Sequence, residues 1–411
     1  MSNIERLPEY QWRPYRWVML IVISFVQIAT NFANIQISAA AVTVITTLGL
    51  TTAQFGAVSA CSFLGGGIFG IAFGGWGDRF GIKRVIGISL IITLIGGVYR
   101  IYATSFASLF ISMFLIGLSM SALNSNSSKI VRMWFAPSQM SFAMSVYIAM
   151  STVGAVLALS TTPAIMNSHS LTTVYIIGLI AILVATVVWF ALAKVKPDGA
   201  PEVKEESVMT YISTAAKSPK LWVNAIAMFC IMGAFITCSS FVVATTTMYK
   251  GLTDVQAGSL SSISAIVAVP LMIILPAIWT KIGRIKWGVI IQLVLGAVLL
   301  IVSWNMEFNV FAMALFILGV SFGGTTIPLM KQYPALLPDV DPKAIGSAGG
   351  IHATFQNFGA FFVPSYILGS IVGENMNLIF YGVAAVWVIA AILMLICPEI
   401  GSKGKTNEDI Q

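Results

Sequence analysis

The sequence predicts an all-α membrane protein with twelve transmembrane helices in two pseudo-symmetric six-helix bundles. The first observation is the composition, since 58% of the 411 residues are hydrophobic and only 9% are charged, which excludes an ordinary soluble domain. The second is a series of apolar runs of about twenty residues, the length that crosses a bilayer as a helix. The third is an internal repeat, because short stretches of the first half recur 202 residues later, as when Thr51 recurs as Thr253.

Twelve apolar runs follow one another along the chain, with short polar segments between them. We expect helices in all of them, because a spanning helix satisfies its own backbone polar groups in lipid. The expected spans cover residues 17–38, 52–74, 85–104, 107–128, 140–163, 172–193, 221–245, 254–279, 287–304, 309–330, 345–371 and 377–397.

The basic residues predict the orientation of these spans. Short loops rich in Lys and Arg stay in the cytoplasm. Of the twenty-two Lys and Arg, all but Arg100 and Lys250 lie in segments 1–16, 75–85, 128–142, 194–220, 281–287, 331–344 and 398–411. We therefore expect both termini in the cytoplasm and the protein in the plasma (cell inner) membrane. The net charge of +7 then reflects insertion into the lipid bilayer, and no nucleic-acid partner is expected.

The two halves of the chain share sequence patterns. Gly49–Gln54 recurs as Gly251–Gln256, and in both copies Thr is followed three residues later by Gln. This is the spacing of a capping box, which opens a helix. In the same register residues 77–82 recur as 279–284. A polar stretch containing Pro and Gly suits a linker. We therefore divide the chain into a first bundle (1–193), a cytoplasmic linker (194–220) and a second bundle (221–411).

A glycine-rich, charged turn at residues 74–84 separates the second and third runs. We expect Gly77 and Gly81 to reverse the chain there, since glycine does so at little steric cost. The turn resembles the loop between spans two and three of the major facilitator superfamily, written G-x-x-x-D-R-x-G-R-K. The matching residues are Gly74, Asp78, Arg79, Gly81 and Lys83, whereas Ile82 stands where that family often has a basic residue. The alternative interpretation is a generic basic loop.

The resemblance to this family covers nearly the whole chain. It implies two parallel halves with the substrate site between them near the membrane midplane. It also implies that spans two and eleven slide past each other as the transporter opens. Both spans have closely spaced glycines, although static close packing would explain these equally well. The resulting candidates for conformational gating are Gly74, Asp78, Arg79, Gly81 and Lys83, with Arg132 as the partner of Asp78.

The charges expected at depth in the membrane are all basic. No Asp or Glu falls in a predicted membrane interior, whereas Arg100, Lys129 and His352 lie inside or nearly inside. Charges at depth are costly and are kept mainly for function, so the pattern favours an anionic substrate and argues against a buried carboxylate as the proton carrier. Each residue has an alternative role: Arg100 can snorkel to the surface, Lys129 can anchor a loop, and His352 can be a hydrogen-bonded packing residue.

Neutral polar residues complete the expected substrate site. Gln27, Asn31 and Asn34 share one face of the first span. That face must look inward, toward substrate or a neighbouring helix, because amides facing lipid would be unsatisfied. The other lining spans implied by the resemblance add further candidates. The full set of substrate-binding candidates is Gln27, Asn31, Asn34, Arg100, Asn124, Tyr147, Thr237, His352 and Gln356.

Two short stretches resemble particular branches of this family. Residues 129–137 resemble cyanate, nitrate/nitrite and some organic-anion porters, and residues 97–100 resemble cyanate porters. Spans two and eight lack the basic residues of the nitrate branch, so nitrate itself is not expected. The predicted function is a secondary active transporter that moves a small, carboxylate-like organic anion by alternating access, with a coupling proton or a counter-substrate.

The alternative function is an exporter of neutral or amphipathic compounds. An enzyme is not expected, because the sequence lacks the clusters of acids, histidines or thiols that acid–base or metal chemistry needs. We expect no cofactor and no metal, and we expect a monomer.

Overall fold

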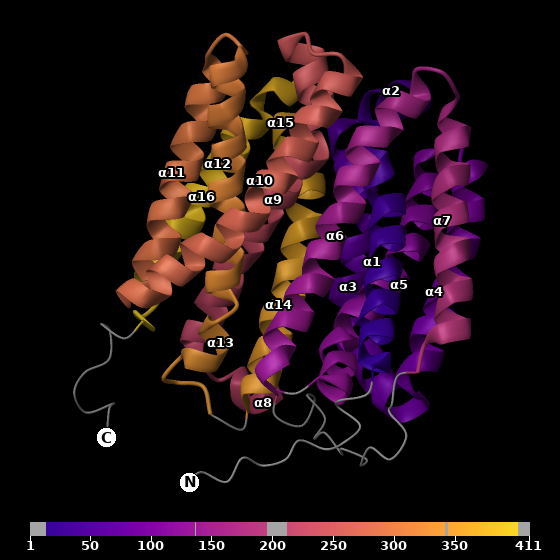
Figure 1. Cartoon of the computed structure of the whole chain (residues 1–411). Helices are drawn as coiled ribbons and strands as arrows, with labels where there is room; N and C mark the ends of the chain where they lie inside the picture. Colours follow the sequence, from indigo (N-terminus) through magenta and orange to yellow (C-terminus); the bar gives the residue numbers. More distant parts are fainter. Residues whose placement is uncertain (1–13, 136, 195–211, 342–343, 402–411) are drawn as a thin grey trace.

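A computed structural model of the chain describes residues 14–135, 137–194, 212–341 and 344–401. Within these residues, twelve helices are long and apolar enough to cross a membrane, which confirms the predicted all-α fold. Figure 1 shows the helices of the first half gathered on one side and those of the second half on the other. The start of α1 (Tyr15–Ala39) and the end of α16 (Ile379–Ile396) lie at the same end of the molecule.

The first half contains six long helices and one short one. The long helices are α1 (Tyr15–Ala39), α3 (Thr52–Phe80), α4 (Ile82–Ile101), α5 (Phe106–Trp134), α6 (Pro137–Met166) and α7 (Leu171–Leu192), and the short α2 (Ala41–Leu48) follows α1. They pack mainly on one another, with α1 against α6 and α7, and α5 against α3 and α4.

The second half repeats this arrangement. Its long helices are α9 (Pro219–Lys250), α10 (Asp254–Ile282), α11 (Ile285–Asn305), α12 (Val310–Met330), α14 (Ile345–Phe362) and α16 (Ile379–Ile396). The eleventh span continues from α14 through a π-helix, η4 (Val363–Ile367), into α15 (Leu368–Val372). Shorter pieces are α8 (Ile212–Ala215), α13 (Tyr333–Leu336) and η5 (Met376–Leu378). The proposed linker boundaries stay a prediction, since residues 195–211 lie outside the described part.

The backbone confirms the sequence repeat. Both Thr51 and Thr253 form complete capping boxes, with the Gln side chain three residues on accepting from the Thr backbone. The helices that they open, α3 and α10, have 29 residues each. Each ends before a glycine with positive φ, 89° at Gly81 and 76° at Gly283.

The turn after α3 is shorter than the sequence predicted. Gly77 does not reverse the chain, because it lies inside α3 and is packed so closely on Asn126 that a Cβ would overlap the amide. Gly81 alone separates α3 from α4. Its positive φ explains why glycine is needed at this one position.

One end of the molecule carries the Gly81 and Gly283 turns. The basic residues Lys194 and Lys331 lie at the same end, which we therefore call the basic end. The two bundles meet at the opposite end. There the Thr52 hydroxyl donates to the Gly373 carbonyl oxygen. The rings of Phe55 and Phe241 also meet there edge to face, with their centres 5.3 Å apart.

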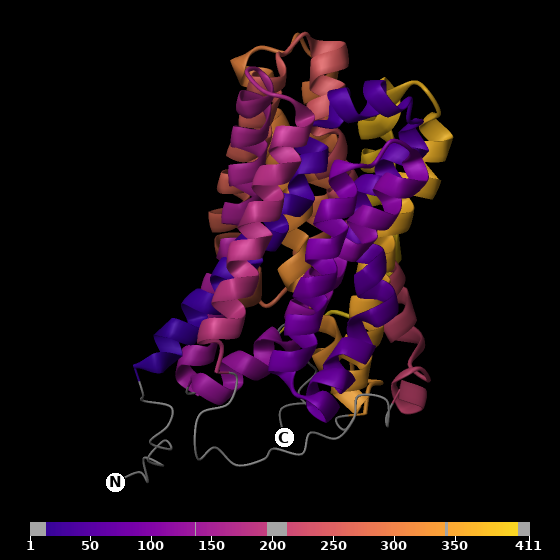
Figure 2. The same cartoon turned by 90° about the vertical axis from the view of Figure 1, so that its right-hand side faces the viewer.

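The close contact between bundles follows α3 and α14 only part of the way toward the basic end. A Cβ on Gly66 or Gly67 would press on Asn357 or Phe358 of α14. By contrast, an added Cβ at Gly74 on α3 or at Gly349 on α14 would have no heavy atom within 4 Å. The described parts of α3 and α14 thus touch toward the opposite end and are apart at Gly74 and Gly349 near the basic end. Figure 2 shows the molecule from the side of the first bundle, with the second bundle behind it.

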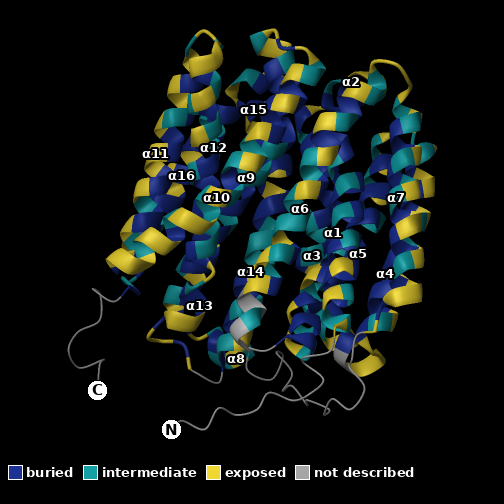
Figure 3. Cartoon of the chain, viewed as in Figure 1, coloured by how far each residue is buried: buried dark blue, intermediate teal, exposed yellow. Residues whose placement is uncertain are grey.

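The burial pattern suits a protein surrounded by lipid. Large apolar side chains such as Ile95, Val187 and Val298 are exposed on the outer faces of α4, α7 and α11, as Figure 3 shows for these helices. Trp189 and Trp387 are fully buried inside the two bundles. An exposed apolar belt of this kind is expected where the solvent is hydrocarbon.

Candidate functional site

A chain of hydrogen bonds crosses the first bundle and joins three predicted site residues. The Tyr147 hydroxyl on α6 lies 2.6 Å from Oδ1 of Asn124 on α5 and 2.9 Å from Oε1 of Gln27 on α1. Gln27 in turn donates to the Ser151 hydroxyl at 3.1 Å. Gln27 and Tyr147 are buried, whereas Asn124 is exposed. A hydroxyl has only one proton to donate, so one of the two amide oxygens is left to accept from another donor.

The remaining amides of α1 lie inside the first bundle. Asn31 donates to the Ser151 backbone oxygen at 2.5 Å and to its hydroxyl at 3.1 Å. Asn34 is buried, and its Oδ1 has no hydrogen-bond partner. The amide row therefore does not face lipid, but for Gln27 and Asn31 the partners belong to α6. The inward face was expected to bond either substrate or a neighbouring helix. For Gln27 and Asn31 it bonds the neighbouring helix in this conformation.

His352 is the main candidate of the second bundle. It lies on α14 with only 3% of its surface exposed, and its Nε2 has no hydrogen-bond partner. Lys331, exposed just after α12, is near enough to interact electrostatically with it. Gln356, one turn further along α14, has only the weak acceptor Met232 Sδ at 4.0 Å for its amide nitrogen. An unpaired buried polar group costs about 1–3 kcal/mol, so it is a good place for a ligand to bind.

Two polar groups that the sequence did not single out lie on the helices that pack around α14. Asn224 on α9 is fully buried, and its Oδ1 has no partner while its amide nitrogen lies 3.8 Å from Met330 Sδ. The Tyr333 hydroxyl on α13 is also buried without a partner. Asn224 is a lone polar residue within an apolar run, and this was the only signal available for it.

Thr237 does not open onto a cavity. It is fully buried on α9, and its hydroxyl donates to the Gly233 carbonyl oxygen one turn back at 2.8 Å. Thr commonly bonds within its own helix in this way. Its placement supports packing rather than substrate contact.

Arg100, a predicted substrate-binding residue whose alternative role was to snorkel to the surface, does not lie at the surface. Its side chain is fully buried within the first bundle. Its guanidinium donates to the Ala33 carbonyl oxygen at 2.6 Å and to Oε1 of Gln36 at 2.8 Å, and it lies 4.4 Å from the centre of the Tyr175 ring. All these partners are protein groups, so in this conformation Arg100 joins α1, α4 and α7 and does not reach a solvent-filled space.

The gating candidates lie at the basic end. Arg79 and Arg132 are exposed, and the Arg79 guanidinium lies 5.2 Å from the centre of the Phe80 ring. Lys83 donates to the Phe190 carbonyl oxygen at 3.1 Å, and Lys129 donates to that of Gly74 at the same distance. The Asp78 side chain lies outside the described part, so its pairing with Arg132 stays a prediction.

Acidic side chains are scarce along the described spans. Apart from Asp78, whose side chain lies outside the described part, Asp254 is the only acidic residue within the described spanning helices, and it is the first residue of its helix. No group of three or more His, Cys, Asp or Glu that could hold a metal ion is found in the described residues.

Comparison with known proteins adds the family. The sequence model of the Major Facilitator Superfamily matches residues 20–364. A hexuronate transporter of Bacillus subtilis (strain 168) is 27% identical over 165 residues, which is 39% of this chain and 39% of that protein. The match thus covers well under half of that transporter's length.

Solved structures show the same fold at low sequence identity. A bacterial homologue of the human lysosomal transporter Spinster, in an inward-facing and unoccupied conformation, has a TM-score of 0.74 at 16% identity and covers 93% of this chain and 95% of its own. The nucleoside transporter NupG has a TM-score of 0.72 at 15% identity and covers 92% and 99%.

Proposed function

This chain belongs to the major facilitator superfamily, and we propose that it is a secondary active transporter that moves a small organic anion across the membrane by alternating access. The observation that carries the proposal is the sign of the charges along the described spans. Lys331 follows α12 and acts electrostatically on His352 of α14. The one acidic side chain described in these spans is Asp254, at the start of α10. A cation such as the Lys331 ammonium near a polar site favours an anion. The partial similarity to a hexuronate transporter, whose substrate is a sugar acid, supports the same class.

The two bundles suit the two ends of a hydroxylated carboxylate. In this proposal the Lys331 ammonium and the His352 imidazole hold the carboxylate, because charge-assisted hydrogen bonds are the stronger ones. The exposed Asn124 amide and the Tyr147 hydroxyl hold substrate hydroxyl groups from the first bundle. A substrate bound by both bundles would stabilise the conformation in which their basic ends lie close together.

The proposed orientation places the basic end in the cytoplasm of a cell whose inner membrane holds the protein. The excess of Lys and Arg at that end supports this orientation. The separated basic end then corresponds to an inward-open conformation. Coupling to a proton, through His352 or the substrate, or exchange for a second anion would drive transport.

Uptake into proteoliposomes tests this function. The purified protein is reconstituted, and uptake of a panel of labelled carboxylates, hexuronates included, is measured in competition with the corresponding carboxamides. We expect saturable uptake of a carboxylate that its uncharged amide does not inhibit. We expect Lys331→Ala and His352→Ala each to reduce it at least tenfold, the effect of losing about 1.4 kcal/mol of binding.

Lys281→Ala is the matched control, because Lys281 is an exposed lysine at the same end of the molecule. Saturable transport of neutral compounds, with no response to carboxylates, would contradict the proposal and support the alternative of an exporter for neutral or amphipathic compounds.

A further inference from the structure

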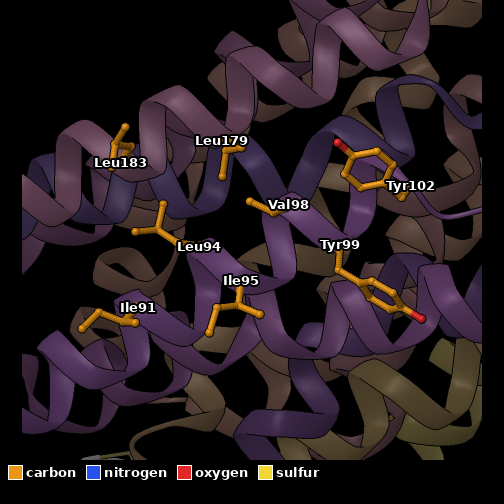
Figure 4. Close-up of a pocket in the computed structure, with 8 residues that line it drawn as sticks. All are labelled: Ile91, Leu94, Ile95, Val98, Tyr99, Tyr102, Leu179 and Leu183. Atoms are coloured by element: carbon orange, nitrogen blue, oxygen red, sulfur yellow. The ribbon is translucent and has the colours of Figure 1, made fainter.

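The pocket on the exposed side of α4 and α7 is an apolar surface (Figure 4). Isoleucine, leucine and valine side chains form most of its lining, and Tyr99 and Tyr102 lie at one end. Such a lining suits contact with lipid and offers few groups that could distinguish one polar solute from another. A connected set of polar groups lies instead inside the first bundle, where Ser151 of α6 joins two amides of α1.

Ser151 is the point at which these two amides meet. Its hydroxyl oxygen lies 3.1 Å from Nε2 of Gln27 and 3.1 Å from Nδ2 of Asn31, and its backbone oxygen lies 2.5 Å from the same Asn31 nitrogen. A hydroxyl oxygen has two lone pairs, so Ser151 accepts from both amides. Ser151 is not among the residues that the sequence predicts for the site.

The bond to Ser151 determines which end of the Gln27 amide faces Tyr147. Because the Gln27 nitrogen donates to Ser151, its oxygen Oε1 faces the Tyr147 hydroxyl, at 2.9 Å. Oδ1 of Asn124 lies 2.6 Å from the same hydroxyl. Two amide oxygens thus share a single phenolic proton, and one of them needs a second donor.

The two amide oxygens differ in their access to other molecules. Gln27 is only 3% exposed, whereas Asn124 is exposed. A donor from outside the protein can therefore reach Asn124 but not Gln27. Since a buried acceptor without a partner is costly, the arrangement is most stable when Tyr147 donates to Gln27 and a bound molecule donates to Asn124.

We infer that Ser151 is a positioning residue that makes the first bundle select a carboxylate with a free hydroxyl group, which donates its hydrogen bond to Oδ1 of Asn124. This inference rests on the proposed function and adds the direction of the hydrogen bond. Without the Ser151 hydroxyl, the Gln27 amide can turn round, so that its nitrogen donates to Tyr147 and Tyr147 donates to Asn124. Asn124 then has its donor within the protein, and the preference for a hydroxylated substrate is lost.

Uptake of matched analogues into proteoliposomes tests the role of Ser151. The probes are the hydroxycarboxylate with the fastest saturable uptake in a labelled panel that includes glucuronate, and its monodeoxy and monodeoxyfluoro forms. Fluorine in place of a hydroxyl group cannot donate a hydrogen bond. For one hydroxyl position, we expect the wild-type protein to show a KM about tenfold higher for both analogues than for the parent compound.

Three variants separate positioning from folding. Ser151→Ala is expected to bring the KM values of parent and analogues to within about threefold of one another, whereas Ser151→Thr keeps the hydroxyl and the preference. Thr161→Val on the same helix is the matched control, because the Thr161 hydroxyl donates to the Leu157 carbonyl oxygen one turn back at 2.6 Å. The ratio of KM values is measured within each variant, so it does not depend on the amount of folded protein.

Each outcome has a distinct meaning. Preference for the hydroxylated parent that survives Ser151→Ala, or that is lost equally in Thr161→Val, would overturn the inference and leave the proposed function standing. Saturable uptake of carboxylates without any preference for the hydroxylated forms would do the same. Absence of saturable uptake of any carboxylate would contradict the proposed function, and this inference with it.

Discussion

The Arg100 guanidinium is a cation buried in a membrane protein with neutral partners. A carbonyl oxygen, an amide oxygen and the face of a tyrosine ring surround it. Each partner offers partial negative charge, and the ring adds a cation–π contribution of about 2 kcal/mol when it is desolvated. Since the partners come from α1 and α7 while Arg100 is on α4, the residue holds three helices of the first bundle together.

Replacing Arg100 is expected to reduce stability before it affects substrate binding. Arg100→Met leaves the buried Gln36 Oε1 without this donor, at about 1–3 kcal/mol, and also removes the bond to the Ala33 carbonyl oxygen. Arg100→Lys keeps the charge but loses the planar fork that bonds both. Thermal unfolding in detergent measures the effect, with Arg84→Met as control because Arg84 is exposed. A melting temperature unchanged in Arg100→Met would contradict the structural role.

At this scale the sequence could predict residue classes but not their partners. The spacing of Gln27, Asn31 and Asn34 required an inward face, and the amides are buried. That Gln27 and Asn31 bond to Ser151 depends on how α1 and α6 are rotated against each other, which spacing within one helix does not fix. Lys331 was assigned to a loop because the apolar run stops at Met330, and its closeness to His352 arises only in the folded bundle.

At the scale of helices, apolar runs predicted all twelve spans, and the differences lie at their ends. The second and fourth spans were expected to end at residues 74 and 128, but α3 continues to Phe80 and α5 to Trp134. Helical hydrogen bonding does not stop where hydrocarbon does, so charged turns such as the one with Arg132 stay helical. The π-helix around Pro364 was not predicted, although proline removes a backbone donor and loosens the local pattern.

Two glycines on α3 offer opposite tests of alternating access. A Cβ on Gly56 would overlap the Pro364 carbonyl oxygen at the closed end, whereas Gly74 at the basic end has no atom within 4 Å of an added Cβ. Gly56→Leu should therefore prevent closure of the opposite end and favour closure of the basic end. Gly74→Leu should be tolerated in the present conformation and should obstruct closure of the basic end.

Spin-label distances between Phe80→Cys on α3 and Ile282→Cys on α10, with the four native cysteines replaced, measure both effects. The two positions are equivalent in the repeat, and both are exposed. We expect shorter distances with Gly56→Leu, and distances that stay long with Gly74→Leu. Both variants should lose most of their transport. A shift in the same direction for both would rule out opposing roles for the two glycines.

At the scale of the whole molecule, the repeat and the charge pattern were sufficient to predict two related bundles. Thr51 and Thr253, and then Gly81 and Gly283, mark the same points in each half. Which end is closed could not be predicted, because both conformations of an alternating-access protein share one sequence. Contacts such as Thr52 with Gly373 show the closed end only once the bundles are placed together.

The most direct test of the account is the same distance between labels at Phe80→Cys and Ile282→Cys, measured in otherwise unmodified proteoliposomes with and without a carboxylate that the protein takes up. If the bundles move around a bound anion, saturating carboxylate will produce a population with a shorter distance between α3 and α10, and Lys331→Ala will abolish that population. A distance distribution that does not change at saturating carboxylate would contradict the account.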